Sequence, residues 1–108
     1  MANLLFVCSE NRLRSPTAEV VFSAYPNIEA IGAGTNADAA TVVSGDLIEW
    51  ADIVFVMEKV HRNKIGKKFR SHLKDKRVIV LAIPDDYSFM DPSLVSLLKV
   101  RVARYVNL

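Results

Sequence analysis

The chain has 108 residues and a formal net charge of +2, and 51% of its residues are hydrophobic. This length suits one hydrophobic core, so we expect a single domain over residues 1–108. No apolar run approaches the roughly 18 to 20 residues that span a membrane, and the N-terminal apolar segment lacks the leading basic region of a signal peptide. A single cysteine excludes an internal disulfide, and a reactive thiol needs a reducing compartment, so the sequence predicts a cytoplasmic protein without a membrane partner.

Short apolar runs alternate with segments of helical periodicity, a pattern that favours βαβ units and a parallel sheet. In chain order we expect a strand over residues 3–7, a helix over 16–25, a strand over 28–31, a loop at 32–36, a helix over 41–50, a strand over 53–57, a helix over 59–74, a strand over 77–83, a loop at 84–92 and a helix over 92–106. Four parallel strands with helices on both faces make a doubly wound α/β fold, whose ligands bind at the carboxyl ends of the strands.

The first expected strand ends at Cys8, and five residues separate this cysteine from Arg14. Ser15 and Pro16 then favour a helix start. The backbone N–H groups of such a loop converge on one point, where the helix N-terminus adds partial positive charge and favours a thiolate. Arginine binds two phosphate oxygens at once through its planar guanidinium. The segment therefore predicts a phosphate-binding loop with a nucleophile at its base, although a buried structural cysteine would share part of the pattern. The loop residues are Ser9, Glu10, Asn11, Arg12, Leu13, Arg14 and Ser15.

These residues resemble the signature of the low-molecular-weight protein tyrosine phosphatases, through Phe6-Val7-Cys8, Asn11 and Arg14-Ser15-Pro16. Residues 32–35, 50–57 and 83–87 resemble later motifs of that family in the same order. The resemblance implies the strand order 2-1-3-4 and an asparagine, Asn11, that fixes the shape of the loop. Asn11 is otherwise a residue that tolerates left-handed backbone. Ser15 either binds the Cys8 sulfur or caps the helix, and both roles are compatible.

Three positions depart from the family pattern. Glu10 stands where the family has a glycine of the loop, and Leu13 stands where many members of the family have a second cysteine. Asp86 stands where the family has a proline after its catalytic aspartate. The stretch between Thr35 and the helix that leads to Trp50 also lacks much of the segment that usually walls the phosphotyrosine pocket in that family. Glu10 is either a solvent-facing residue or a group that rejects highly anionic substrates or recognises a cationic or hydrogen-bond-donating part of the substrate.

The general acid is expected to be an aspartate after the fourth strand. Asp85 matches the family motif best, and its strand end lies at the same edge of the sheet as Cys8. Asp86 is the alternative acid because it is adjacent. Asp91 is expected to cap the last helix rather than to act in catalysis.

The sequence thus predicts a phosphomonoesterase similar to a protein tyrosine phosphatase, with a phosphocysteine intermediate on Cys8, phosphate held by Arg14 and an aspartate acid. Its substrate would be a phosphorylated protein or a small phosphoester, and neither a cofactor nor a metal is expected. One alternative is a non-catalytic phosphate-binding module in which Glu10 has prevented turnover. The other is a thiol-dependent arsenate reductase, which would need an external thiol because Cys8 is the only cysteine.

Nine lysines and arginines lie between Lys59 and Arg77, opposed only by Asp75. Such a segment attracts an anionic partner, for example a nucleotide, RNA or an acidic protein. The alternative is a solvated helix face, and the scarcity of aromatic residues for stacking within this segment favours that interpretation. His61 has helical spacing with Ile65 and Phe69, which predicts a histidine in the core.

Overall fold

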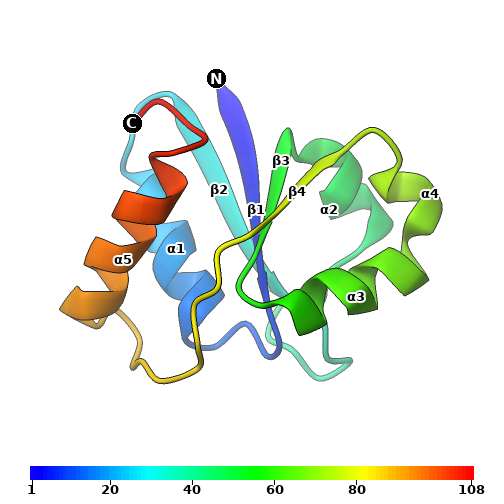
Figure 1. Ribbon diagram of the computed structural model, residues 1–108, viewed down its shortest axis with the longest axis horizontal. Helices are drawn as coiled ribbons and strands as arrows, with labels where there is room; N and C mark the ends of the chain where they lie inside the picture. Colours follow the sequence, from blue (N-terminus) through cyan, green and yellow to red (C-terminus); the bar gives the residue numbers. More distant parts are fainter.

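The computed structural model describes all of residues 1–108. Its four strands form one parallel sheet in the order β2-β1-β3-β4, which confirms the expected fold and strand order (Figure 1). The strands are β1 (Ala2–Cys8), β2 (Ile28–Gly34), β3 (Ile53–Val56) and β4 (Arg77–Val80).

Helices cover both faces of this sheet (Figure 1). One face carries α1 (Arg14–Ser23) and α5 (Pro92–Val102). The other carries α2 (Gly45–Trp50), α3 (Lys59–Lys68) and the short α4 (Arg70–Leu73). No helix is long and apolar enough to cross a membrane.

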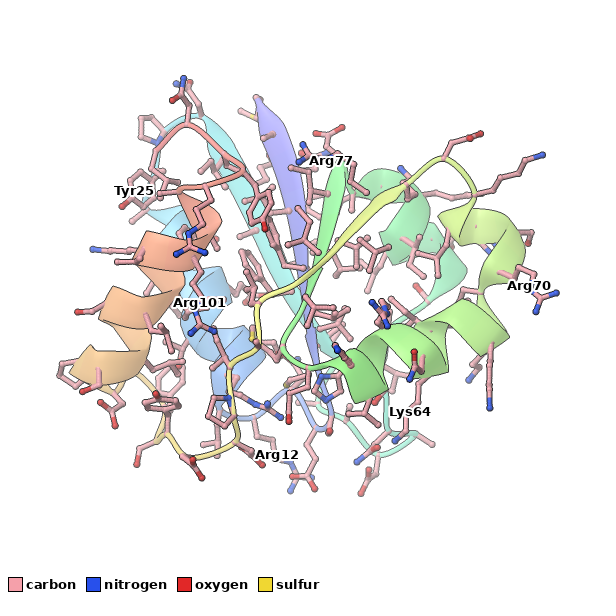
Figure 2. The ribbon with its side chains drawn as sticks, in the orientation of Figure 1. Arg12, Tyr25, Lys64, Arg70, Arg77 and Arg101 are labelled. Carbon is pink, nitrogen blue, oxygen red and sulfur yellow. The ribbon has the colours of Figure 1, made fainter.

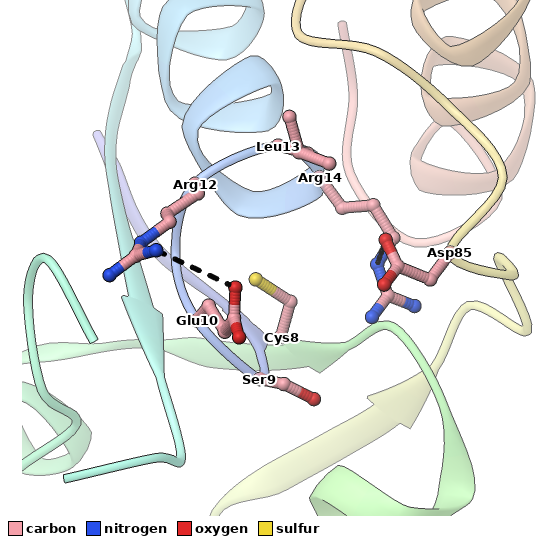
Figure 3. Close-up of a pocket in the computed structure, with 7 residues that line it drawn as sticks. All are labelled: Cys8, Ser9, Glu10, Arg12, Leu13, Arg14 and Asp85. Carbon is pink, nitrogen blue, oxygen red and sulfur yellow. Dashed lines mark ion pairs between the residues drawn. The ribbon is translucent and has the colours of Figure 1, made fainter. Parts of the chain in front are cut away.

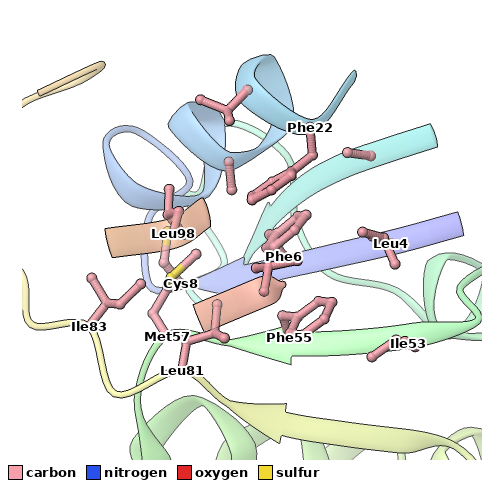
Figure 4. Packing of buried hydrophobic residues seen from close by; sticks show 14 of the residues in the cluster. Leu4, Phe6, Cys8, Phe22, Ile53, Phe55, Met57, Leu81, Ile83 and Leu98 are labelled. Carbon is pink, nitrogen blue, oxygen red and sulfur yellow. The ribbon is translucent and has the colours of Figure 1, made fainter. Parts of the chain in front are cut away.

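The central strand β1 is buried on both faces, as its continuous apolar run predicts. Leu4, Phe6 and Cys8 belong to the core cluster beneath α1 and α5, while Leu5 and Val7 belong to the cluster on the opposite face. The Phe6 ring lies between the rings of Phe22 and Phe55, with centroids 5.2 Å from each (Figure 4). Packing on two sides therefore fixes the strand that ends at Cys8.

The glycine-rich residues 32–36 were expected to be a loop, and this prediction was wrong for Gly32 to Gly34, which belong to β2. A Cβ at Gly34 would lie 2.5 Å from the Ser9 carbonyl oxygen, and a Cβ at Gly32 would lie 2.7 Å from the Ser15 carbonyl oxygen. The glycines therefore serve the close approach of the loop after β1 and not a turn.

Two helices differ from their expected extent. The helix expected over residues 59–74 breaks at Phe69, whose φ of −123° and ψ of 36° leave the helical region, and both Phe69 and Leu73 pack against the core on the α2 side. The helix expected from residue 41 begins only at Gly45, because the Ser44 side chain accepts a hydrogen bond from the backbone N–H of Leu47 and caps it there. The first and last helices end earlier than expected, at Ser23 and Val102.

The chain runs on beside β3 after β4 ends. The N–H groups of Leu81 and Ile83 donate to the carbonyl oxygens of Val56 and Met57, both at 2.8 Å. Between them Ala82 is left-handed, with a φ of 56°, which explains why the regular strand stops before the expected residue 83. The Arg101 guanidinium donates to the carbonyl oxygens of Leu81 and Ala82. This segment carries Asp85 to the carboxyl edge of the sheet.

Candidate active site

Cys8 is the last residue of β1, and its side chain is buried, with 3% of its surface exposed. The backbone N–H of Asn11 donates to its sulfur at 3.2 Å, and the Ser15 hydroxyl oxygen lies 2.9 Å from the sulfur. Asn11 adopts the left-handed conformation that its residue type tolerates, with a φ of 54°. The loop therefore turns back over the cysteine and directs the Asn11 N–H at its sulfur.

Ser15 lies inside α1, so the expectation that it caps this helix is wrong. The capping position belongs to Leu13, whose side chain makes no capping hydrogen bond. Instead, the Ser15 hydroxyl lies 2.6 Å from the Asn11 side-chain oxygen, in addition to its contact with Cys8. The contact between the Ser15 and Asn11 side chains therefore stabilises the loop around Cys8.

Arg14 is the first residue of α1 and is buried, with 3% of its surface exposed. Its Nη1 donates to the Glu58 carboxylate at 2.6 Å and to the Ile83 carbonyl oxygen at 2.8 Å. Its Nε lies 3.6 Å from the Asp85 carboxylate. A buried guanidinium held at one nitrogen by two acceptors has a fixed direction, and its remaining N–H groups stay available to a ligand.

A cavity of about 290 Å³ opens above the cysteine (Figure 3). Its lining consists of Cys8, Ser9, Glu10, Arg12, Leu13, Arg14 and Asp85. The structure thus brings the predicted nucleophile, arginine and first candidate acid to one cavity. The alternative acid, Asp86, is exposed and lies outside this lining.

Glu10 and Arg12 form the rim of the cavity. Both side chains are more than half exposed, and their charged groups are 4.0 Å apart (Figure 3). Glu10 is therefore exposed, as the simpler interpretation predicted, but it also lines the cavity. The lining contains no aromatic side chain.

No protein-family model matches this sequence, and no curated protein matches it. Solved structures do match. A low-molecular-weight protein tyrosine phosphatase from Streptococcus pyogenes is similar with a TM-score of 0.80 and 14% identity, over 99% of this chain and 95% of that one. The tyrosine phosphatase Wzb from Escherichia coli K30, in complex with phosphate, is similar with a TM-score of 0.75 and 21% identity, over 97% of this chain and 96% of that one. The YwlE arginine phosphatase from Geobacillus stearothermophilus is similar with a TM-score of 0.71 and 23% identity, over 96% of this chain and 92% of that one.

The chain has the low-molecular-weight phosphatase fold. The matches run over nearly the whole length of both chains, so the fold suggested by the motifs extends through the connections between them.

Within this phosphatase fold, two residues near the cavity were missed as site residues by sequence reasoning. Glu58 lies two residues beyond the end of β3, just before α3, and its carboxylate accepts a hydrogen bond from Arg14. His61 is buried without any exposed surface, as its helical spacing predicted, but both of its ring nitrogens make hydrogen bonds. Nδ1 accepts from the backbone N–H of Glu58 at 3.0 Å, and Nε2 lies 2.9 Å from the Ser9 hydroxyl oxygen. The signal for both was their position just after the third strand, at the edge where ligands bind.

Burial, assisted by the nearby Arg14 charge, lowers the pKa of His61 from 6.5 to about 4. Between these values the unfolded chain binds a proton at this residue and the folded protein does not, so the stability contributed by neutral His61 is complete above pH 6.5 and is lost as the pH falls to about 4. We expect the unfolding free energy to fall by roughly 3 kcal/mol more between pH 7 and 4 in the wild type than in a His61→Gln variant. Urea denaturation at a series of pH values measures this difference, and equal slopes in the two proteins would contradict it.

Proposed function

We propose that the chain is a cysteine-dependent phosphatase of the low-molecular-weight protein tyrosine phosphatase family, which hydrolyses phosphomonoesters through a phosphocysteine on Cys8. The observation that carries this proposal is the cavity that the Cys8 sulfur shares with the buried Arg14, at the start of α1. A nucleophile, a fixed guanidinium and a helix N-terminus at one point form a site for a phosphoryl group.

In the first step, the Cys8 thiolate attacks phosphorus in line, and the bond from phosphorus to the leaving oxygen breaks. Asp85 gives its proton to that oxygen. In the second step, water attacks phosphorus, the Asp85 carboxylate takes a proton from it, and the sulfur–phosphorus bond breaks. Arg14 and the backbone N–H groups of the loop stabilise the negative charge on the equatorial oxygens in both steps. The Ser15 hydroxyl donates to Asn11 Oδ1 at 2.6 Å in the free protein, and it lies 2.9 Å from the sulfur, so a turn of its one hydrogen from Asn11 to the sulfur would stabilise the departing thiolate.

A mutant of the YwlE arginine phosphatase carries a phosphorylated active-site serine, so a covalent phosphoenzyme forms in one protein of this fold. This supports a covalent intermediate here over the non-catalytic module and over the arsenate reductase. The solved neighbours include tyrosine phosphatases and arginine phosphatases, and we propose a phosphorylated protein or a small phosphoester as the substrate.

The decisive assay is hydrolysis of p-nitrophenyl phosphate by the wild type, with a chelator present, together with rapid mixing and acid quench. We expect turnover with a burst of p-nitrophenol that equals the enzyme concentration, and a phosphoenzyme that survives the quench. Binding of phosphate without any turnover would contradict the proposal and favour the non-catalytic module.

We propose Asp85 as the general acid, because it lines the cavity and its carboxylate lies 3.6 Å from Arg14 Nε. Asp85→Asn is expected to lower kcat/KM, which reports the first step, about 100-fold with phenyl phosphate, whose leaving group needs a proton, and less with p-nitrophenyl phosphate. Asp86→Asn is the matched control and should leave kcat/KM within about twofold, since Asp86 lies outside the lining. A larger loss of activity in the Asp86→Asn variant than in the Asp85→Asn variant would indicate that Asp86, and not Asp85, is the general acid.

We propose that the basic segment Lys59–Arg77 receives the acidic part of a phosphorylated partner. Lys64, Lys67 and Lys68 line a second cavity of about 420 Å³, together with Thr35 and Asn36 of the segment that follows β2. Asn36 binds the Ser9 carbonyl oxygen at 2.9 Å, so this basic surface adjoins the phosphate-binding loop, and Lys64 and Arg12 lie toward the same edge (Figure 2). Phosphopeptides with acidic flanks should have lower KM values than neutral ones, and this difference should shrink with added salt. Equal KM values would contradict the proposal.

We also propose a cytoplasmic location, since Cys8 must stay reduced to act as the nucleophile. Cell fractionation of the tagged protein checks this, and recovery from an oxidising compartment would contradict it.

A further inference from the structure

We infer that the Ser9 hydroxyl donates a hydrogen bond to the phosphate group bound in the cavity, and that His61 is the positioning residue that fixes its direction. The inference rests on the proposed phosphatase site, and it gives roles to two side chains that the reaction steps above do not use.

The direction of the bond follows from the ring of His61. A neutral imidazole carries one hydrogen, on either Nδ1 or Nε2. The backbone N–H of Glu58 donates to Nδ1 at 3.0 Å, so Nδ1 is the acceptor and the hydrogen is on Nε2. Nε2 therefore donates to the Ser9 oxygen, 2.9 Å away.

A hydroxyl that accepts from one side turns its own hydrogen toward another. The Ser9 hydroxyl makes no further hydrogen bond within the chain, and Ser9 lines the cavity together with Cys8 and Arg14. The free hydrogen is thus available to the oxygens of a phosphate held over the Cys8 sulfur. Without His61, the same hydroxyl could equally present a lone pair, which would repel a phosphate oxygen.

The ring must stay neutral for this direction to hold, and its surroundings keep it so. The charged groups around it are Arg14 of α1, Lys64 of α3, Glu58 before α3 and Asp85 after β4. Burial together with the two cations outweighs the two carboxylates, and the lowered pKa leaves His61 neutral over about pH 5 to 8.

His61 also ties this donor to the arginine. The residue whose N–H it accepts, Glu58, binds Arg14 Nη1 through its carboxylate at 2.6 Å. One buried ring from α3 therefore sets the direction of the Ser9 hydroxyl and holds the backbone of the residue that anchors Arg14.

The test uses inorganic phosphate as the probe and calorimetry on the whole chain, so it needs no turnover. Ser9→Ala should weaken phosphate binding roughly 10- to 100-fold, the effect of one hydrogen bond to a charged group. His61→Asn keeps an acceptor near Nδ1 but cannot reach Ser9, and we expect a similar loss. The double variant should bind no more weakly than either single variant, because both changes remove one interaction. His61→Gln, which places an amide donor near Nε2, should recover most of the affinity.

Thermal unfolding of each variant identifies losses that come from misfolding. Unchanged phosphate affinity in Ser9→Ala would overturn the inference, and so would losses that add in the double variant of a folded protein. If the variants differ from the wild type in phosphate affinity as expected, but the wild type hydrolyses no phosphoester, only the proposed function would be contradicted. A wild type that binds no phosphate would overturn both.

Discussion

Replacing Cys8 with serine is expected to lower kcat for p-nitrophenyl phosphate by at least about 10⁴-fold, because a serine hydroxyl is not ionised at neutral pH and is a poor nucleophile. The substitution changes one buried atom, which lies 3.2 Å from the Asn11 nitrogen and 2.9 Å from the Ser15 oxygen. Both of these neighbours can hydrogen-bond an oxygen as well as a sulfur. We therefore expect the Cys8→Ser variant to fold and to retain affinity for inorganic phosphate.

The measurement is steady-state hydrolysis beside calorimetric phosphate binding and thermal unfolding of the same preparation. A Cys8→Ser variant that keeps more than about 1% of the wild-type kcat would show that the reaction does not pass through Cys8. A control change at an exposed residue away from the cavity, Val100→Ala, should leave kcat within about threefold, since Val100 is 60% exposed on α5 and lies outside the cavity lining.

Replacing Arg14 with lysine should cost about 10³-fold in kcat/KM, even though the charge is kept. The guanidinium reaches the Glu58 carboxylate and the Ile83 carbonyl oxygen from one nitrogen and leaves other N–H groups for the substrate. A lysine ammonium is a single point donor and cannot hold both protein acceptors and two phosphate oxygens in one plane. Because Arg14 is buried, solvent cannot replace the contacts that are lost.

Arg12→Lys makes the same chemical change two residues earlier in the loop and serves as the control. The Arg12 side chain is 59% exposed, and its one charged neighbour, Glu10, is 4.0 Å away. We expect kcat/KM of this variant to stay within about threefold of the wild type. Wild-type kcat/KM in the Arg14→Lys variant would indicate that only positive charge is needed at this position, and equal losses in the two variants would indicate that Arg14 has no special geometry.

The placement of Cys8, Arg14 and Asp85 around one cavity could be predicted because it depends on topology. Parallel strands bring their carboxyl ends to one edge, so residues that follow the first and fourth strands meet there whatever the details of the connections. The same topology places Glu58 and His61 near that edge, but it does not show which groups they bind. Apolar periodicity reported correctly that His61 is buried, but it carries no information on which polar groups, some 50 positions away in the chain, surround a buried ring.

The differences between the expected and the observed helices and strands also have physical causes. Composition assigned Gly32 and Gly34 to a loop, whereas they are strand residues whose missing side chains make room for the backbone of Ser9 and Ser15. The break at Phe69 comes from packing of its ring and of Leu73 against the core, which overrides a continuous helical pattern. Left-handed backbone at Ala82 has no sequence signal, because alanine is not a residue that favours it.

The close approach of the loop to Gly34 has a consequence for how the protein is made. The loop is shaped by backbone from β2, by His61 from α3 and by Ile83 beyond β4, so no single stretch of the chain contains it. These contacts link residues 8–15 to residues as far along as 83, and such distant contacts form late because the intervening chain must first be ordered. During synthesis or refolding, the loop therefore gains its shape only when all four strands are paired. A time course of phosphate binding during refolding would therefore follow the completion of the four-stranded sheet and would not detect partly formed intermediates.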